Sequence, residues 1–208
     1  MKRTKLQIFI PLVIILLSSI LFQTNAQSIK IDIKTELSDK ASNDVQAIKA
    51  GIISTLKDHI TWIKVVNVGE DYSFWIKNLS LTPKKDNPFI TIVSFNLELR
   101  TAAMFSQGKL IIQQPIKFEY DPQQELPLQQ KELETYLSKI NKDISGAGIT
   151  TIAAISTLGT SILAQACIKT AAFLQKDFTA AQQKSAILAG YYTVHALYSM
   201  LKKQGHFN

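Results

Sequence analysis

The stretch Phe89-Ile-Thr-Ile-Val-Ser-Phe-Asn-Leu-Glu-Leu-Arg100 decides the fold of the front half of this chain. Every second position from Phe89 to Leu99 is apolar or threonine, whereas the positions between them are polar from Ser94 onward. Successive side chains of a strand point to opposite faces, so this alternation predicts a long strand with one buried face.

The segments around it carry the patterns of further strands. Residues 29–34 and 72–81 alternate in the same way, and residues 110–118 follow a turn at Gly108. Pro115 cannot donate a backbone hydrogen bond, which places that last strand at a sheet edge or a bulge. Trp62–Val68 can add a short strand.

One helix is expected between the first two strands. Ser42 can cap its start, and its apolar residues share one face: Val45, Ile48, Ile52, Ile53, Leu56 and Ile60. The order of strand, helix and antiparallel strand meander predicts an α+β fold in which the helix covers one face of the sheet.

This order resembles the cystatin-like arrangement, in which an antiparallel sheet grips a helix. Protease-inhibiting members of that group carry a Gln-x-Val-x-Gly loop after the helix. The nearest stretch here is Val65-Val66-Asn67-Val68-Gly69, which lacks both the glutamine and the central valine. The resemblance therefore implies topology alone and does not imply inhibition.

A boundary is predicted at residues 121–130, which read DPQQELPLQQ and have the composition of a linker. The spacing of the apolar residues changes there from a period of two residues, typical of strands, to a period of 3.6 residues, typical of helices. We therefore expect an α+β sheet domain over residues 27–120 and a helical region, a hairpin or small bundle, over residues 131–208.

The last helix has clear end signals. Thr179 and Gln182 fit a capping box, which predicts a helix from Ala180 to about Gln204. Gly205 follows where a left-handed residue commonly ends a helix.

Residues 1–26 have the three zones of a secretory signal peptide. Three positive residues precede an apolar run at 8–22, and Thr24 and Ala26 are small residues at the cleavage positions. A retained membrane anchor is the alternative, but the run holds only 15 residues and includes Pro11. We expect export to a periplasmic or secreted location, possible membrane association, and Gln27 as the first mature residue.

Residues 144–168 form the one segment long enough to be a second membrane span. They contain no charge over 25 residues, but only eight are Ile or Leu. These eight residues favour insertion into a membrane, whereas the small and hydroxyl-bearing residues oppose it. The total free energy of insertion therefore lies near zero. The composition favours a helix buried in protein, with insertion into a membrane as the alternative.

Charge and composition argue against several classes of function. Removal of the signal lowers the net charge from +7 to +4, and the remaining lysines are scattered, so nucleic acid is not an expected partner. No metal-ligand spacing, phosphate loop or nucleophile motif is present, and no cofactor is expected. Cys167 is the only cysteine, and its apolar neighbours indicate burial rather than an intermolecular bridge.

Two groups of aromatic residues are candidates for binding. Trp62, Tyr72 and Trp75 lie close together in the sequence near the first hairpin. Phe74 and Trp75 must point to opposite faces of their strand, so one of the two is a candidate for exposure. Exposed aromatic residues anchor interfaces, although they also cover sheet edges.

The second group is Tyr191, His195 and Tyr198, which share one helical face at spacings of four and three. One interpretation is a polar site at a seam between helices. The other is an amphipathic stripe in which the rings are buried and their polar tips reach solvent.

These features predict an exported, non-catalytic interaction or assembly module, whose front domain binds a protein partner and whose helical region self-associates. One alternative is a membrane-anchored envelope protein with residues 144–168 inserted. Another is a small exported hydrolase or lipid-binding protein with a site between sheet and helices. The sequence does not decide whether a small molecule binds.

Overall fold

The structure is a computed structural model of the chain. It describes residues 28–36, 41–58, 60, 62–103, 106–127, 129–146, 160–175 and 177–207. The expected signal peptide at residues 1–26 and residues 147–159 of the apolar segment lie outside this part of the chain.

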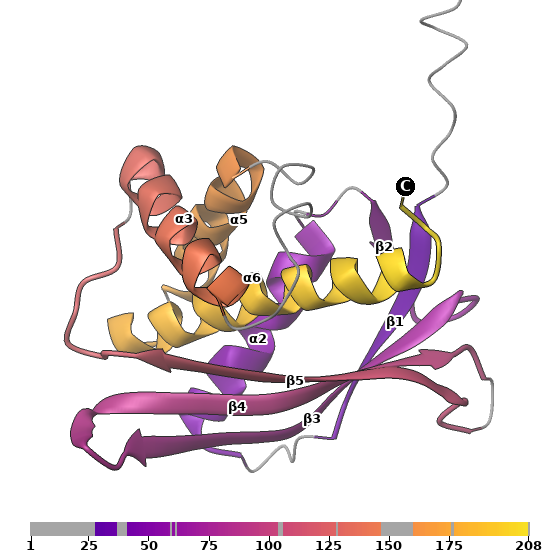
Figure 1. Cartoon of the computed structure of the whole chain (residues 1–208), viewed down its shortest axis with the longest axis horizontal. Helices are drawn as coiled ribbons and strands as arrows, with labels where there is room; N and C mark the ends of the chain where they lie inside the picture. The colour runs from indigo at the N-terminus through magenta and orange to yellow at the C-terminus, as the bar shows by residue number, and fades with distance from the viewer. Residues whose placement is uncertain are drawn as a thin grey trace, which may run out of the picture.

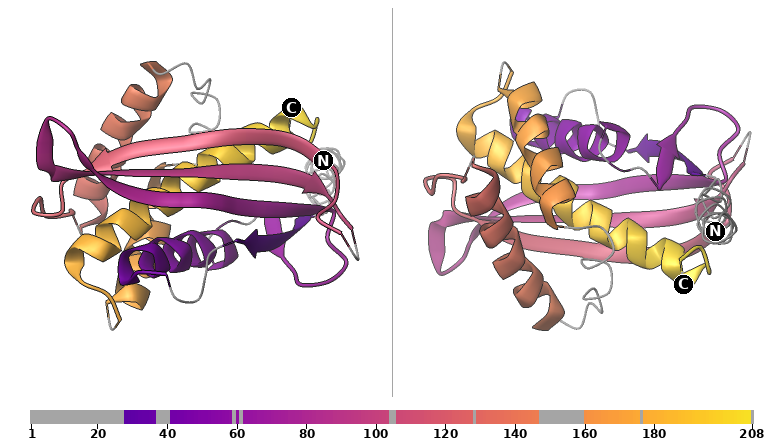
Figure 2. Two further views of the ribbon diagram at one scale, coloured as in Figure 1. Left: turned by 90° about the horizontal axis from the view of Figure 1, so that it is seen from below. Right: turned by 90° about the horizontal axis from the view of Figure 1, so that it is seen from above.

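The predicted α+β class is confirmed. Five strands form one mixed sheet, and the four described helices lie on one side of it (Figure 1, Figure 2). The strands are β1 (Ile29–Thr35), β2 (Ile63–Val65), β3 (Tyr72–Lys84), β4 (Asn87–Thr101) and β5 (Leu110–Tyr120), in the order β2-β1-β3-β4-β5.

The predicted antiparallel meander is β3-β4-β5, but β1 runs parallel to both of its neighbours. Side chains alternate with the same period in parallel and antiparallel strands, so the sequence pattern does not distinguish the two arrangements. Because β1 lies between β2 and β3, the chain from residue 66 to residue 71 passes the end of β1, and Asp71 N donates to Lys30 O at 2.8 Å.

The inner face of the sheet forms the base of the core. Val93, Phe95, Leu97 and Leu99 of β4 are all at most 2% exposed, as their alternation predicts. Two helices pack on this face of the sheet: α2 (Asn43–Asp58) contacts β2 and β3, and α6 (Ala180–Lys203) contacts β4 and β5. Apolar burial of this kind contributes about 25 cal/mol for each Å² removed from water.

The crossing of α2 and α6 depends on small residues. A methyl group at Gly51 would lie 2.6 Å from the Cβ atom of Ala186, and one at Gly190 would lie 2.4 Å from Thr55 Oγ1. Both glycines therefore allow the two helices to approach more closely than any larger residue permits.

The ends of α6 agree with the prediction. Thr179 Oγ1 accepts from Gln182 N, and Thr179 N donates to Gln182 Oε1, which completes the capping box. Gly205 has a φ of +82°. Most side chains of this helix are buried, because it lies between the sheet and a second layer formed by α3 (Gln130–Gly146) and α5 (Thr160–Leu174) (Figure 1).

One hydrophobic cluster includes residues from both sides of the expected linker, such as Phe74 and Leu97 of the sheet and Leu137 and Leu197 of the helices. The division into domains at residues 121–130 stays a prediction. Across the described ranges, no helix is both long enough and apolar enough to cross a membrane. Of the segment 144–168, the first three residues belong to α3 and residues 160–168 to α5.

Candidate functional site

The structure distributes the six candidate binding residues over three places. Trp62, Tyr72 and Tyr198 come to one end of the molecule, where the C-terminal residues also lie. Trp75 belongs to the sheet face that no described helix covers. Tyr191 and His195 lie in the interior.

We call the first place the aromatic end, and define it as Trp62, Tyr72, Tyr198, His206 and Phe207. The rings of Tyr198 and Phe207 are stacked, with centroids 4.6 Å apart and planes 5° apart. Trp62 meets both of them edge to face, at 5.7 Å and 5.3 Å. Such offset and perpendicular contacts are the favoured geometries of aromatic pairs.

The end of α6 explains why the last residues reach this place. His206 N donates to Leu201 O at 3.2 Å, and Gly205 N donates to Lys202 O at 2.9 Å. This pair of bonds around a left-handed glycine is a Schellman motif, which reverses the chain at the end of a helix. The reversal brings Phe207 back over Tyr198, one helical turn before the end.

A hydrogen bond joins the tail to the sheet. Tyr72 Oη and His206 Nε2 are 2.7 Å apart, and their rings meet edge to face at 5.4 Å. Partial burial and, secondly, the negative charge of Asp71 raise the pKa of Tyr72. Its hydroxyl therefore stays protonated at neutral pH and is able to donate to the imidazole.

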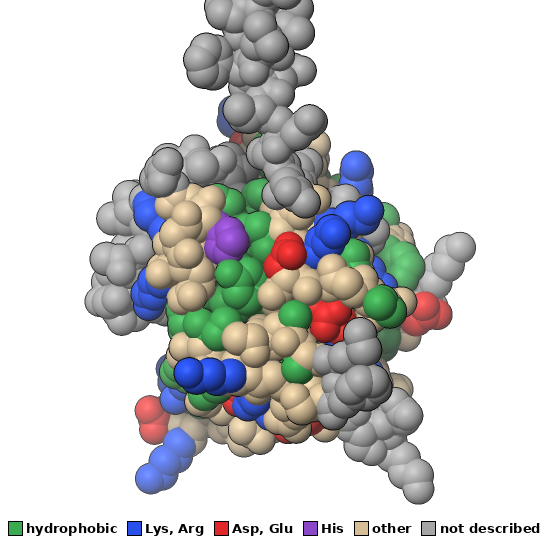
Figure 3. Space-filling view, turned by 90° about the vertical axis from the view of Figure 1, so that its right-hand side faces the viewer, with side chains coloured by type: hydrophobic (Ala, Val, Ile, Leu, Met, Phe, Trp, Pro, Cys, Tyr) green, Lys and Arg blue, Asp and Glu red, His purple; other side chains and the backbone are tan. Residues whose placement is uncertain are grey.

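The aromatic end is in part a surface. His206 is exposed, and Trp62, Tyr72 and Phe207 are half-buried, whereas Tyr198 is only 3% exposed. The indole Nε1 of Trp62 is buried and has no hydrogen-bond partner in the described part of the chain. Figure 3 views the molecule from this end and shows hydrophobic side chains gathered at the surface beside a histidine.

The second place is the uncovered sheet face, which Figure 2 shows from below. The ammonium group of Lys77 lies 5.0 Å from the ring centroid of Trp75. Lys77 also pairs with Glu36 at 2.7 Å and with Glu98 at 3.4 Å, and Arg100 Nε lies 2.7 Å from the same Glu98 carboxylate. The charges of these two basic and two acidic side chains sum to zero. Each charged group lies within 3.4 Å of a group of opposite sign, which holds it in position.

The third place is the interior of the helical layer. Tyr191 Oη donates to Leu137 O of α3 at 3.4 Å, and the ring of His195 lies 4.5 Å from that of Tyr191. His195 is 2% exposed, and neither of its ring nitrogens has a hydrogen-bond partner in the described residues. Burial lowers the pKa of His195 to about 4. The imidazole is therefore neutral at physiological pH and is not at the surface.

Cys167 is buried, as the sequence predicts, and burial raises the pKa of its thiol to about 12. It is therefore protonated and unreactive in the folded protein. In the part of the chain that the structure describes, no cluster of three or more His, Cys, Asp and Glu side chains is arranged to hold a metal ion.

Sequence reasoning missed His206 and Phe207. The structure docks both residues, His206 against Tyr72 of β3 and Phe207 against Tyr198 of α6. The available signal was Gly205 followed closely by an aromatic residue, since the Schellman motif commonly brings a hydrophobic residue after the glycine back onto the helix. Comparison of the chain with known protein families and with curated proteins finds no match.

Proposed function

We propose that this protein is an exported, non-catalytic interaction module that contacts a protein partner through its aromatic end. One observation carries the proposal: the rings of Trp62 and Tyr72 meet the rings of Phe207 and His206, which lie far away in the sequence, at one end of the molecule. Tryptophan and tyrosine dominate the binding energy of protein interfaces because they bury a large area at low cost in conformational entropy.

The geometry also supports a preorganised contact. Each ring at the aromatic end is held by another ring or by the bond between Tyr72 and His206, so little conformational freedom remains to be lost on binding. The charged group around Lys77 and Glu98, on the uncovered sheet face, is likewise fixed by its ion pairs. A partner with a hydrophobic centre and a polar rim suits such a surface.

Affinity capture with purified, tagged protein tests the binding surface. The protein is mixed with the extracellular and envelope fractions of the producing cells, and the captured proteins are compared between wild type and Phe207→Ala. Phe89→Ala is the matched control, because Phe89 is 66% exposed in the β3–β4 hairpin, outside the aromatic end. We expect one captured protein to be lost with Phe207→Ala and kept with Phe89→Ala. Equal capture by all three proteins contradicts the proposal.

Export forms a separate part of the proposal and rests on the sequence of residues 1–26. We expect the protein to be recovered from the medium or the envelope fraction with Gln27 as its first residue, as measured by intact mass. Recovery from the cytoplasm with residues 1–26 still attached contradicts export.

The helical region is proposed to self-associate through the outer side of α5. Ile162 and Phe173 are 55% and 64% exposed, and their spacing of 11 residues places them on the same helical face. In an antiparallel pair of α5 helices, Ile162 of one copy faces Phe173 of the other. In that register each Lys169 lies opposite Ala166 rather than a second lysine, so the stripe is complementary to itself under two-fold symmetry.

Light scattering after size exclusion measures this association. The average mass of the wild-type protein is expected to rise with concentration, and Phe173→Ser is expected to keep it at one chain. Phe89→Ser removes a ring of the same exposure elsewhere and leaves the association unchanged. A wild-type protein that stays a single chain at every concentration contradicts this part of the proposal.

A further inference from the structure

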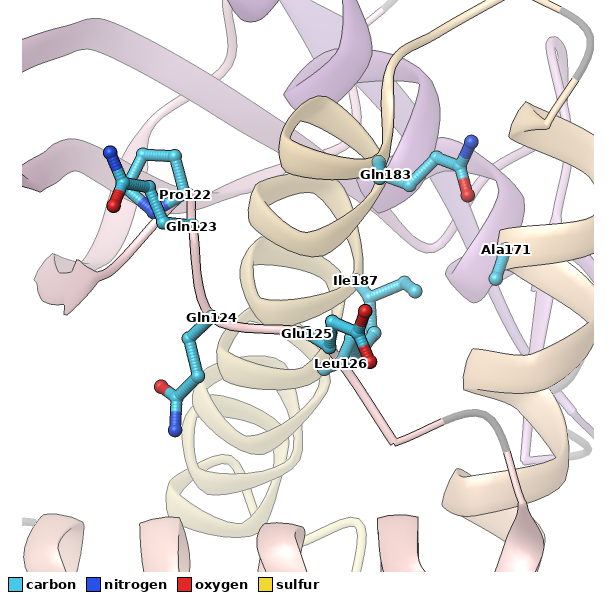
Figure 4. Close-up of a pocket in the computed structure, with 9 residues that line it drawn as sticks. Pro122, Gln123, Gln124, Glu125, Leu126, Ala171, Gln183 and Ile187 are labelled. Atoms are coloured by element: carbon cyan, nitrogen blue, oxygen red, sulfur yellow. The ribbon is translucent and has the colours of Figure 1, made fainter.

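We propose that a pocket between α6, α5 and the chain before α3 binds a protonated alkylamine. The segment before α3, residues 121–127, is here called the strap. The pocket has a volume of about 370 Å³, within the range of small-ligand sites. Its lining comes from the strap, from Ala171 of α5 and from the first turns of α6 (Figure 4).

The strap is fixed to α6 by a buried lysine. Lys184 is 2% exposed, and its Nζ donates to Asp121 O at 2.9 Å and to Gln124 O at 2.7 Å. The Asp121 carboxylate in turn accepts from Gln123 N at 2.8 Å. The wall of the pocket is thus held by three hydrogen bonds rather than left as a free loop.

The floor of the pocket is apolar. Ile187 and Leu126 supply hydrocarbon surface, and Ala171 and Ala180 are too small to fill the space between the helices. Figure 4 shows Ile187 projecting from α6 toward the side of the pocket on which Ala171 lies. A ligand with a short hydrocarbon body fits this surface, because it removes apolar area from water.

The polar groups that face the pocket are acceptors. The carboxylate of Glu125 lies over Ile187 and turns toward the pocket, whereas the side chains of Gln123 and Gln124 turn away (Figure 4). Glu125 makes no hydrogen bond or ion pair with any residue that the structure describes. The amide nitrogen of Gln183 donates to Phe178 O at 2.8 Å, which leaves its Oε1 as an acceptor.

These acceptors favour a ligand with a positive charge. Neither lysine, arginine nor histidine contributes to the lining, and the ammonium group of Lys184 is directed at the strap carbonyls. A carboxylate ligand meets repulsion from Glu125 and finds no positive side chain in the lining. A primary ammonium group donates to the Glu125 carboxylate and to Gln183 Oε1 in charge-assisted bonds, while its hydrocarbon chain covers Ile187.

Two sources carry this chemistry, a free alkylamine and the side chain of a lysine in a peptide. Both are tested with the wild-type protein by calorimetric titration, using n-butylammonium and the capped peptide Gly-Lys-Gly. Either ligand binding supports the site, and the tighter of the two identifies the source. Binding of neither overturns the proposal.

The role of the charge is tested with n-butanol and butyrate, which share the hydrocarbon chain. We expect n-butylammonium to bind about tenfold more tightly than n-butanol, and Glu125→Gln to remove that difference. Glu132→Gln removes an equal charge from an exposed position in the first turn of α3 and leaves the affinity unchanged. Equal affinity for the amine and the alcohol, or tighter binding of butyrate, overturns the proposal.

The position of the site is tested by filling it. Ala180→Leu adds hydrocarbon at an exposed rim position and is expected to weaken amine binding at least tenfold, with the thermal unfolding transition as the check on folding. Phe207→Ala leaves amine binding unchanged, because the pocket does not include the aromatic end. This site therefore stands or fails independently of the proposed partner surface. Unchanged amine binding in Ala180→Leu overturns its location.

Discussion

Lys184 and His195 are two buried polar side chains on the same face of α6, but they differ in their hydrogen bonds. Each is 2% exposed. The Lys184 ammonium group donates to two backbone carbonyls, at 2.9 Å and 2.7 Å, whereas neither nitrogen of His195 has a partner in the described residues. A buried polar group stabilises a fold only when its hydrogen bonds are made, so the two residues are expected to have opposite effects on stability.

Burial lowers the pKa of both side chains, but with different consequences. Lys184 carries its charge toward the strap, so its attraction for the carbonyls offsets part of the cost of burial. His195 is neutral, and among the described residues neither of its ring nitrogens finds the hydrogen bond that would offset the cost of burial. Two side chains that are equally buried on one helical face can therefore change the free energy of unfolding in opposite directions. The direction depends on whether each side chain has hydrogen-bond partners.

The largest expected effect is the dependence of stability on pH that His195 causes. The pKa of His195 is about 4 in the folded protein, below the ordinary value of 6.5. As the pH falls, the unfolded chain therefore binds a proton first, and stability is lost between about pH 6.5 and pH 4. The loss due to this group amounts to about 3 kcal/mol.

Urea unfolding at pH 7 and at pH 4.5 measures this effect in the wild-type protein and in His195→Leu. The variant is expected to lose less stability between the two pH values, since it has no proton to gain at this position. An equal loss in both proteins contradicts the interpretation of His195 as a buried neutral base.

Lys184→Met is the next largest change. Methionine keeps much of the hydrocarbon but leaves Asp121 O and Gln124 O without their donor. We expect the free energy of unfolding to fall by about 1–3 kcal/mol, measured by urea unfolding at pH 7. Lys203→Met at an exposed position of α6 is the control and is expected to change little. A neutral effect of Lys184→Met contradicts the role of the lysine as the anchor of the strap.

His195→Leu at pH 7 is expected to have the opposite sign. Leucine has no hydrogen bonds to lose, so the free energy of unfolding is expected to stay the same or to rise by about 1 kcal/mol. The double variant with Lys184→Met sharpens the comparison, because residues 11 positions apart on a helix are separated by about 16 Å and their effects are expected to add. A large loss of stability in His195→Leu contradicts the assignment of His195 as an unpartnered group.

The smallest expected effect is that of Tyr72→Phe at the aromatic end. The variant keeps the ring contact with His206 but removes the 2.7 Å hydrogen bond. A loss of about 0.5–1.5 kcal/mol is expected for one hydrogen bond, at the low end here because His206 is exposed. Thermal unfolding of the two proteins provides the measurement. A loss as large as that of Lys184→Met contradicts the picture of the aromatic end as a surface.

Some features were predictable because they depend on residues close together in the sequence. The alternation from Phe89 to Leu99 predicted β4, and the pair Thr179 and Gln182 predicted the start of α6. Both rest on local geometry, namely the two-residue period of a strand and the unpaired amides of a first helical turn.

Other features were not predictable because they depend on partners far away in the chain. The spacing of Tyr191, His195 and Tyr198 predicted a shared helical face, but α3 covers Tyr191 while Trp62 and Phe207 meet Tyr198. The burial of Lys184 depends on the return of the strap, which lies about 60 residues earlier in the chain and provides the carbonyls that make the burial favourable. That the six candidate residues bind a partner stays a prediction.

Photo-crosslinking in the producing cells tests the central claim, that the aromatic end is the contact surface for a partner. A photoreactive phenylalanine is placed at Val68, in the loop that joins β2 to β3 between Trp62 and Tyr72, or at Phe89 in the β3–β4 hairpin, both of which are largely exposed. The account predicts one discrete adduct from Val68 that disappears when Phe207→Ala is added, and no such adduct from Phe89. Adducts that are equal at the two positions, or an adduct at Val68 that survives Phe207→Ala, would contradict it.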